Sequence, residues 1–308
     1  MEQQVRPGEV DLARLKQRMG RVGVWSNRIG QESAATAGAA VSELEDLGYG
    51  TVWVGETPAS KEALVHAGIL LNATREVMIA TGIVNIWGRD ATAASNGAKA
   101  LAEASGDRFI LGLGVSHAPL VSSRGHDYRR PLAAMRAYLD AMDAAPYEGP
   151  VSAPVPRMLA ALRSGMLELA GSRTEGAHPY FVTPEHTARA RAVLGPDPVL
   201  APEQTVVLTT DPDRARTIGR VFTTGYLAMP NYANHMRALG WDERDLADGG
   251  SDKLVDAIVA WGEPEQIAER IRAHHDAGAD HVCVQPLART ADEQLAQLRA
   301  LAPVLTGN

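Results

Sequence analysis

The feature that most constrains this chain is a regular alternation of short apolar runs with longer amphipathic segments. The run at 22–25 is followed by a helical pattern at 33–47, which ends at Gly48, and then by a second apolar run at 51–56. Parallel strands need a long crossover connection between them, and this spacing supplies one. The pattern therefore predicts β-α-β units and a parallel sheet.

The same alternation continues along the chain and predicts eight strands. They are expected at 22–25, 51–56, 77–83, 108–115, 157–161, 176–180, 203–208 and 280–285. Eight β-α units in 308 residues favour a (β/α)8 TIM barrel over an open doubly wound sheet. We expect a single domain over 1–308, with an N-terminal extension at 1–20 and a mainly helical insertion at 209–262 between strands 7 and 8.

Composition and charge narrow the class of function. Lys and Arg total 30 against 37 Asp and Glu, a net charge of −7 that disfavours binding to a nucleic-acid backbone. No run approaches the ~20 apolar residues of a membrane span. The single cysteine, Cys283, excludes an internal disulfide, and the nine histidines lack the common metal-binding spacings. We expect a soluble cytoplasmic protein with no metal site.

In a barrel of this kind the reactive residues follow the C-terminal ends of the strands. Glu56 follows strand two, His117 follows strand four, and His178 lies in strand six. His117 fits either a lining or proton-transfer role or a loop cap, and His178 fits the same pair of roles. Glu56 fits a ligand-orienting or proton-accepting role, or a structural carboxylate bonded to amides of the rim. Trp25 is placed either to line the binding site of an aromatic ligand or to pack in the core.

Two further features bear on cofactor binding. The sequence Arg163-Ser164-Gly165 follows a strand and opens a helix, which would bring a guanidinium, a hydroxyl and free amides to one phosphate site. The alternative is that these residues only begin the helix. The Gly112-x-Gly114 pair does not support a dinucleotide site, because the third glycine position is His117. These glycines are expected either to let a cofactor approach a barrel strand closely or to mark a tight strand end.

Several segments, taken together and in order, resemble one family. They are Arg21–Trp25, Leu47–Tyr49, Thr51–Glu56, Ala80–Trp87, Asp107–His117, Gly176–Thr187 and Leu200–Gln204. In these segments the chain resembles the bacterial luciferase-like superfamily, and within it the actinobacterial branch of coenzyme F420-dependent oxidoreductases. The resemblance covers nearly the whole sequence.

The resemblance implies a (β/α)8 barrel that holds a flavin or 5-deazaflavin in its mouth, against a non-prolyl cis peptide that aligns with Gly82-Ile83. It implies hydride transfer to or from the ring, with His117 as the preferred proton carrier and Glu56 or His178 second. The cofactor-binding residues it implies are Trp25, Gly82, Ile83, Val84, Asn85, Ser116, Arg163, Ser164 and Gly165.

The sequence also departs from one branch of that family. In the sugar-phosphate dehydrogenases strand two ends in Asp-His and strand four leads to a Glu, whereas this chain has Glu56-Thr57 and His117. We therefore expect an F420-dependent oxidoreductase that acts on another small organic substrate and forms a homodimer. The alternatives are an FMN-dependent luciferase-like monooxygenase and a barrel that binds the cofactor without turnover.

Overall fold

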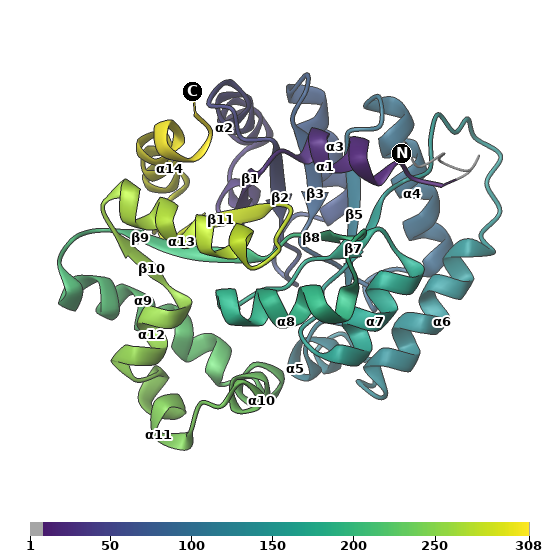
Figure 1. Cartoon of the computed structure of the whole chain (residues 1–308). Helices are drawn as coiled ribbons and strands as arrows, with labels where there is room; N and C mark the ends of the chain where they lie inside the picture. The colour runs from purple at the N-terminus through teal and green to yellow at the C-terminus, as the bar shows by residue number, and fades with distance from the viewer. Residues whose placement is uncertain (1–8, 308) are drawn as a thin grey trace.

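The computed structural model describes residues 9–307. Its strands are β1 (Val22–Ser26), β2 (Thr51–Val54), β3 (Met78–Thr81), β4 (Val84–Asn85), β5 (Phe109–Gly114), β6 (Arg157–Leu159), β7 (Gly176–Ala177), β8 (Val199–Leu200), β9 (Glu203–Leu208), β10 (Ala260–Gly262) and β11 (Val282–Pro286). Helices lie between most of these strands and surround the sheet (Figure 1). The protein is therefore an α/β fold, as the alternation predicts.

Fourteen α-helices are present within residues 9–307. They are α1 (Leu12–Met19), α2 (Ala34–Asp46), α3 (Ala63–Ala73), α4 (Ala91–Ala104), α5 (Ala118–Ser122), α6 (Pro131–Asp143), α7 (Ser164–Arg173), α8 (Pro184–Leu194), α9 (Pro212–Leu227), α10 (Pro230–Leu239), α11 (Glu243–Leu246), α12 (Asp252–Ile258), α13 (Pro264–Asp276) and α14 (Ala291–Leu305). Short 3₁₀ turns occupy Ile29–Gln31 and Ala247–Gly249.

The strands form one curled sheet in the order β10-β9-β11-β1-β2-β3-β5-β6-β7-β8, and β4 pairs with β5. Within residues 9–307 the paired strands all run parallel. Only Ala201 and Pro202 separate β8 from β9, which lie near opposite ends of this order. Ala201 N donates to Ala177 O on one side, and Cys283 N donates to Pro202 O on the other, both at 2.9 Å. The sheet thus curls round on itself.

Three strand predictions need correction. The predicted strand at 77–83 is divided into β3 and β4, because the Gly82-Ile83 peptide bond is cis and interrupts the ladder. The predicted strand at 176–180 is reduced to two residues, since Pro179 has no N–H to donate to a ladder. The two-residue β8 and the three-residue β10 were not predicted, because runs this short carry no periodic signal.

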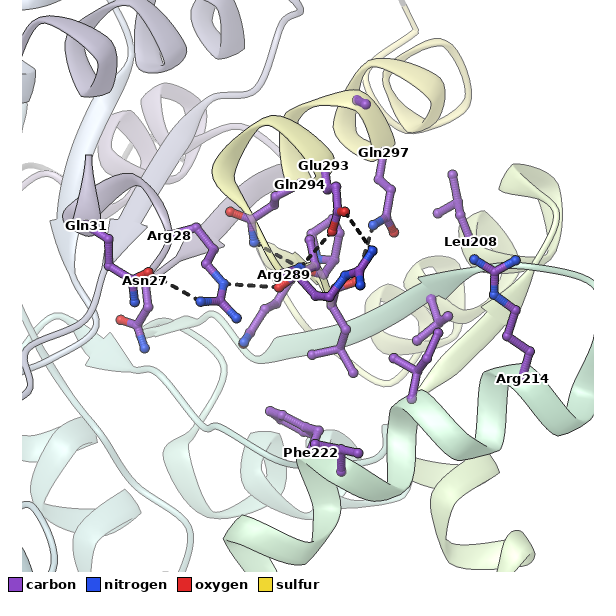
Figure 2. A pocket seen from close by; sticks show the side chains of 18 of the residues that line it. Asn27, Arg28, Gln31, Leu208, Arg214, Phe222, Arg289, Glu293, Gln294 and Gln297 are labelled. Carbon is purple, nitrogen blue, oxygen red and sulfur yellow. Dashed lines mark hydrogen bonds and ion pairs between the residues drawn. The ribbon is translucent and has the colours of Figure 1, made fainter. Parts of the chain in front are cut away.

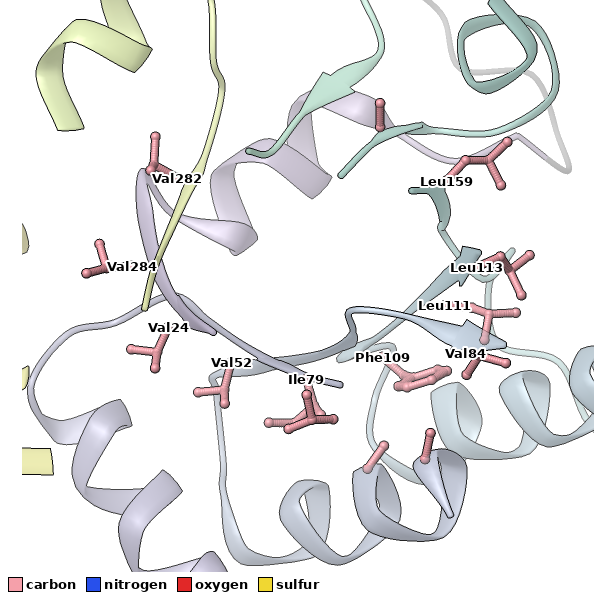
Figure 3. Close-up of a cluster of buried hydrophobic side chains, with 14 of the residues drawn as sticks. Val24, Val52, Ile79, Val84, Phe109, Leu111, Leu113, Leu159, Val282 and Val284 are labelled. Atoms are coloured by element: carbon pink, nitrogen blue, oxygen red, sulfur yellow. The ribbon is translucent and has the colours of Figure 1, made fainter. Parts of the chain in front are cut away.

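The two faces of the sheet bury different side chains. Val24, Val52 and Ile79 point outward toward the helices, in the cluster that Figure 3 shows. Their neighbours point inward, where the parallel register aligns Trp25 with Trp53, Trp53 with Ala80 and Ala80 with Ile110. The interior is therefore filled by side chains, among them Cys283.

The inner cluster is covered at one end by α1. Asp11 caps this helix by accepting from Arg14 N at 3.0 Å. Leu15 and Met19 of α1 pack into the inner cluster, and Thr51 Oγ1 at the start of β2 donates to Met19 O at 2.9 Å. Residues 9–20 of the predicted N-terminal extension thus contain a helix at the N-terminal ends of the strands.

Between β9 and β11 the chain forms α9 to α12, then β10 and α13. Their shared core contains Met236 and Leu254 together with Phe181, which follows β7, and Val207 of β9. In Figure 1 these green helices stand beside the sheet near α8 and β9. None of the helices within residues 9–307 has the length and apolar content needed to cross a bilayer.

Candidate functional site

The turn after β3 presents backbone rather than side chain. Trp25 Nε1, from the end of β1, donates to Gly82 O at 3.1 Å. A Cβ atom on Gly82 would lie 2.7 Å from Trp25 Nε1 and 3.1 Å from His178 Nε2, so no side chain fits there. The peptide bond that follows, to Ile83, is cis, as the resemblance implies.

Glycines in β5 allow this turn to lie close to the neighbouring strand. A Cβ on Gly112 would fall 1.8 Å from Thr81 O, and one on Gly114 would fall 2.5 Å from Ile83 Cγ1. Thr81 Oγ1 donates to Gly112 O at 2.9 Å and accepts from Gly112 N at 2.9 Å. The Gly-x-Gly pair therefore permits close packing of β5 against the turn after β3, a role that the sequence did not predict.

Glu56 holds the segment after the turn. Its Oε2 accepts from Asn85 N at 2.7 Å, and its Oε1 pairs with Arg89 Nη2 at 2.5 Å. Arg89 also pairs with Glu62 of the loop before α3. The Glu56 and Arg89 side chains are only 5% and 11% exposed, so this ion pair is shielded from water. Of the two predicted roles for Glu56, the contacts match the carboxylate bonded to amides of the rim.

His117 lies at the start of α5 and faces α10. Its Nδ1 is 3.2 Å from Asn231 Oδ1, and its ring centroid is 5.4 Å from that of Tyr232. Burial lowers the pKa of His117, while the hydrogen bond to Asn231 opposes this change. The imidazole is therefore neutral near pH 7. Because Asn231 Oδ1 can only accept, Nδ1 carries the proton and Nε2 retains its lone pair.

His178 lies inside the curled sheet, where it is almost fully buried. Its ring stacks on Trp53 at 4.2 Å between centroids, and its Nδ1 is 2.7 Å from Ala201 O. Burial lowers its pKa to about 4. Its Nε2 has no hydrogen-bond partner within residues 9–307 and faces the backbone of Gly82. His178 thus lies beneath the turn, whereas His117 lies at the rim.

The predicted phosphate site is at the start of α7. Ser164 and Gly165 form its first turn, where the N–H groups have no acceptor within the helix. Arg163 precedes them, and its Nη2 donates to Asn231 O at 3.4 Å. Since Asn231 also contacts His117, this residue links the phosphate-site prediction to the predicted proton carrier. Ser116, in the same region, has a positive φ of 57°.

Sequence reasoning missed a row of hydrogen-bonded side chains beside Trp25. Tyr226 Oη donates to Tyr180 Oη at 3.0 Å, and Tyr180 Oη donates to Gln285 Oε1 at 2.7 Å. The Tyr180 ring lies 5.1 Å from that of Trp25. Burial raises the pKa of Tyr226 to about 12, so these phenols remain protonated. No sequence motif relates Gln285 of β11 to Tyr226 of α9.

A cavity of about 1170 Å³ adjoins this row (Figure 2). Tyr226 and Gln285 line it, together with Arg28 after β1, Phe222 of α9 and Leu287 after β11. None of the site residues predicted from sequence lines this cavity. The row from Tyr226 through Tyr180 to Trp25 therefore connects the wall of the cavity to the turn at Gly82.

Glu203 is a buried acid that the sequence analysis did not single out as a site residue. It is 1% exposed, accepts from Thr205 Oγ1 at 2.6 Å and from Phe181 N at 3.4 Å. Burial raises its pKa to about 8, against the opposing effect of these two hydrogen bonds. Glu203 is therefore mainly protonated at neutral pH inside the curled sheet.

This raised pKa makes the stability of the protein depend on pH. The folded state retains a proton that the unfolded state releases near pH 4.5, so the contribution of Glu203 to stability is present below that pH and lost as the pH rises toward 8. Glu203→Gln mimics the protonated form. We expect its free energy of unfolding, relative to the parent, to rise by more than about 1 kcal/mol between pH 5 and pH 8 in urea titrations. Parallel pH profiles for the two proteins would contradict this, and Glu269→Gln on the exposed face of α13 is the control.

Comparison with known proteins agrees with this fold. A profile of the luciferase-like monooxygenase family matches residues 19–281. A relative from Mycobacterium tuberculosis, named for an inferred coenzyme F420-dependent oxidoreductase activity, is 33% identical over 121 residues, 39% of this chain and 33% of its own length. The 5,10-methylenetetrahydromethanopterin reductase of Methanolobus tindarius is 23% identical over 283 residues, 77% of this chain and 86% of its own length.

Solved structures share the fold at low sequence identity. An F420-dependent secondary alcohol dehydrogenase in complex with an F420-acetone adduct has a TM-score of 0.72 and 14% identity, over 92% of this chain and 98% of that one. The FMN complex of the oxygenating constituent of 3,6-diketocamphane monooxygenase from Pseudomonas putida has a TM-score of 0.70 and 15% identity. The match covers 93% of this chain and 96% of that one.

The fold, the family profile and the relatives together define an enzyme of the oxidoreductase class. The chain belongs to the luciferase-like monooxygenase family. Both F420-dependent enzymes and an FMN-dependent monooxygenase are among the proteins that it resembles.

Proposed function

We propose that the chain is a (β/α)8-barrel oxidoreductase that transfers hydride between coenzyme F420 and a small organic substrate. The observation that carries the proposal is the 33% identity over 121 residues to a relative named for F420 dependence. The alternative, an FMN-dependent monooxygenase, is supported by the FMN complex among the structural neighbours. A cytoplasmic location and a homodimer are parts of the same proposal.

The residues of the rim fit a deazaflavin. The turn at Gly82-Ile83 offers a flat backbone surface without a side chain at Gly82, and the Trp25 indole borders it. At the proposed phosphate site Arg163 and the first turn of α7 supply a cation and amide donors for a phosphodiester. No group of three or more potential metal ligands occurs within residues 9–307, and this chemistry requires none.

When bound, coenzyme F420 supplies or accepts a hydride. His117 accepts or returns the accompanying proton at Nε2, because Asn231 occupies its Nδ1 and burial keeps the ring neutral. Glu56 acts as a positioning residue through Asn85 and Arg89. His178 supports the turn at Gly82 from below. Asn85 and Ser116 complete the proposed cofactor surface, to which Val84 contributes only its backbone because its side chain is fully buried in the outer cluster.

Titration of the purified protein with F420 and with FMN tests the cofactor, with tryptophan fluorescence as the readout. We expect F420 to bind at micromolar concentration or tighter and to quench the fluorescence, and Trp25→Phe to reduce this quenching because Trp25 borders the turn. Trp241→Phe, after α10, is the control. Tight binding of FMN alone would favour the monooxygenase, and binding of neither would refute both enzyme functions.

His117→Ala tests the proton carrier. With a panel of alcohols and aldehydes, turnover is followed by loss of the visible absorbance of oxidised F420. We expect the variant to retain F420 affinity and to lose about 10² to 10⁴ of the rate, the usual range for a general acid or base. Undiminished turnover would show that His117 lines the site but does not transfer the proton. F420 binding without turnover of any compound in the panel would favour the non-catalytic barrel.

A further inference from the structure

One face of α9 forms a wall of the cavity described above. Arg214, Ile218, Val221, Phe222 and Tyr226 all line it, and their spacing of 4, 7, 8 and 12 residues from Arg214 places them on a single side of the helix. At 1.5 Å per residue, Arg214 and Tyr226 are separated by about 18 Å along the helix axis. The wall is therefore long enough to hold an extended molecule.

The cavity is positive although the chain is acidic. Arg28, Arg214 and Arg289 line it against one acid, Glu293, a balance of 3 − 1 = +2, whereas the whole chain carries −7. No carboxylate within residues 9–307 lies within 4.0 Å of the Arg214 guanidinium. Figure 2 shows Arg214 at the end of the cavity away from Asn27 and Arg28. This end is suited to an anion.

The middle of the wall is apolar and open. Val221 is 77% exposed, the highest value among the exposed large apolar side chains of the described chain, and it faces the cavity beside Phe222. Leu287 after β11 lines the same space. An apolar surface bounded by charged residues is characteristic of a ligand-binding groove.

The other end of the wall approaches the candidate active site. Tyr226 contacts Tyr180 through the hydroxyl hydrogen bond, and the Tyr180 ring packs on Trp25, whose indole bonds to Gly82 O. A molecule lying along α9 with its anionic end at Arg214 would thus direct its other end toward the turn at Gly82.

We propose that this cavity binds an amphipathic carboxylate, with the carboxylate at Arg214, an apolar body along Ile218, Val221 and Phe222, and the reacting carbon near Tyr180. That this molecule is the substrate rests on the proposed oxidoreductase function; that the cavity binds such a molecule does not. The volume of about 1170 Å³ exceeds the needs of a small ketone or alcohol and suits a longer chain.

Isothermal titration calorimetry of the full chain tests this, with decanoate as probe and decyltrimethylammonium as the cation of matched length. We expect decanoate to bind at least tenfold more tightly than the cation. Arg214→Met, which keeps an apolar stem, should weaken decanoate binding about tenfold, as loss of a charge-assisted contact does. Arg272→Met, on the exposed face of α13, should leave it unchanged. Equal affinity for the two probes, or for parent and Arg214→Met, would overturn the proposal.

A second pair of variants tests the apolar wall at positions where the side chains are exposed and do not support the core. Val221→Asp places a charge against the apolar body of the bound molecule, at an exposed position, and we expect it to abolish decanoate binding. Val65→Asp makes the same change at the 63% exposed Val65 of α3 and should bind as the parent does. Decanoate binding retained by Val221→Asp would show that this wall is not the site.

Repeating the titration with F420 present separates this inference from the proposed function. We expect decanoate and F420 to bind at the same time, each with an affinity within a few fold of its value when it binds alone. Displacement of decanoate by F420 would assign the cavity to the cofactor and overturn the inference, while leaving the F420 proposal intact. Decanoate binding without any F420 binding would uphold the carboxylate site and refute the cofactor.

Discussion

Glu56→Ala is expected to lower the free energy of unfolding by about 3 to 5 kcal/mol, the cost of leaving one member of a buried ion pair without its partner. The substitution removes both the contact with Arg89 and the acceptor for Asn85 N. Glu62 is the remaining partner of Arg89 and is itself largely exposed. Urea unfolding measures the loss, and F420 titration should show weaker binding because the segment after the turn is released.

Two further variants identify the cause of that loss. Glu243→Ala removes an exposed pair with Arg237 and should leave the free energy of unfolding close to that of the parent. The double variant Glu56→Ala/Arg89→Met should recover part of the stability, since it no longer buries a cation whose remaining partner is the exposed Glu62. A Glu56→Ala protein as stable as the Glu243→Ala control would mean that the pair is not shielded from water.

Gly82→Ala is expected to cost about 1 to 3 kcal/mol, the usual range for overpacking a filled interior. The added Cβ would lie 2.7 Å from Trp25 Nε1 and 3.1 Å from His178 Nε2, so the indole must shift and its hydrogen bond to Gly82 O must weaken. We therefore expect lower stability together with an altered tryptophan emission. Both are measured in one fluorescence-detected urea titration.

Gly225→Ala is the matched control. A Cβ on Gly225 of α9 has no atom within 4 Å, and alanine favours a helix by up to about 1 kcal/mol over glycine. This variant should be as stable as the parent or more so, with unchanged emission. If Gly82→Ala behaves in the same way, the space beneath the turn is larger than the packing indicates.

Much of the fold is predictable because long apolar runs buried on both faces have a strong signal. The run Phe109–Gly114 is an example, and β5 occupies it. Val199–Leu200 was missed because two residues before Pro202 give no period to detect, although β8 brings the ends of the sheet together. The length of a strand, more than its importance to the architecture, thus decides whether sequence can find it.

The site was predictable only where it follows strand ends. Glu56 and Trp25 were found in this way, and their contacts with Asn85, Arg89 and Gly82 are local to the turn. The cavity was not found, because its lining is drawn from positions as distant in sequence as Asn27 and Gln297. Tyr226 likewise meets Tyr180 only after α9 has packed, a tertiary event that no motif records.

The helix α1 has a practical consequence for experiments at the surface of a sensor or bead. Because Leu15 and Met19 of α1 pack into the inner cluster at the N-terminal ends of the strands, a linker attached to the exposed Gln17 of this helix departs from the side opposite Glu56 and His117. Tethering the protein at Gln17 therefore leaves the candidate site facing the bulk solution, where ligands arrive unobstructed.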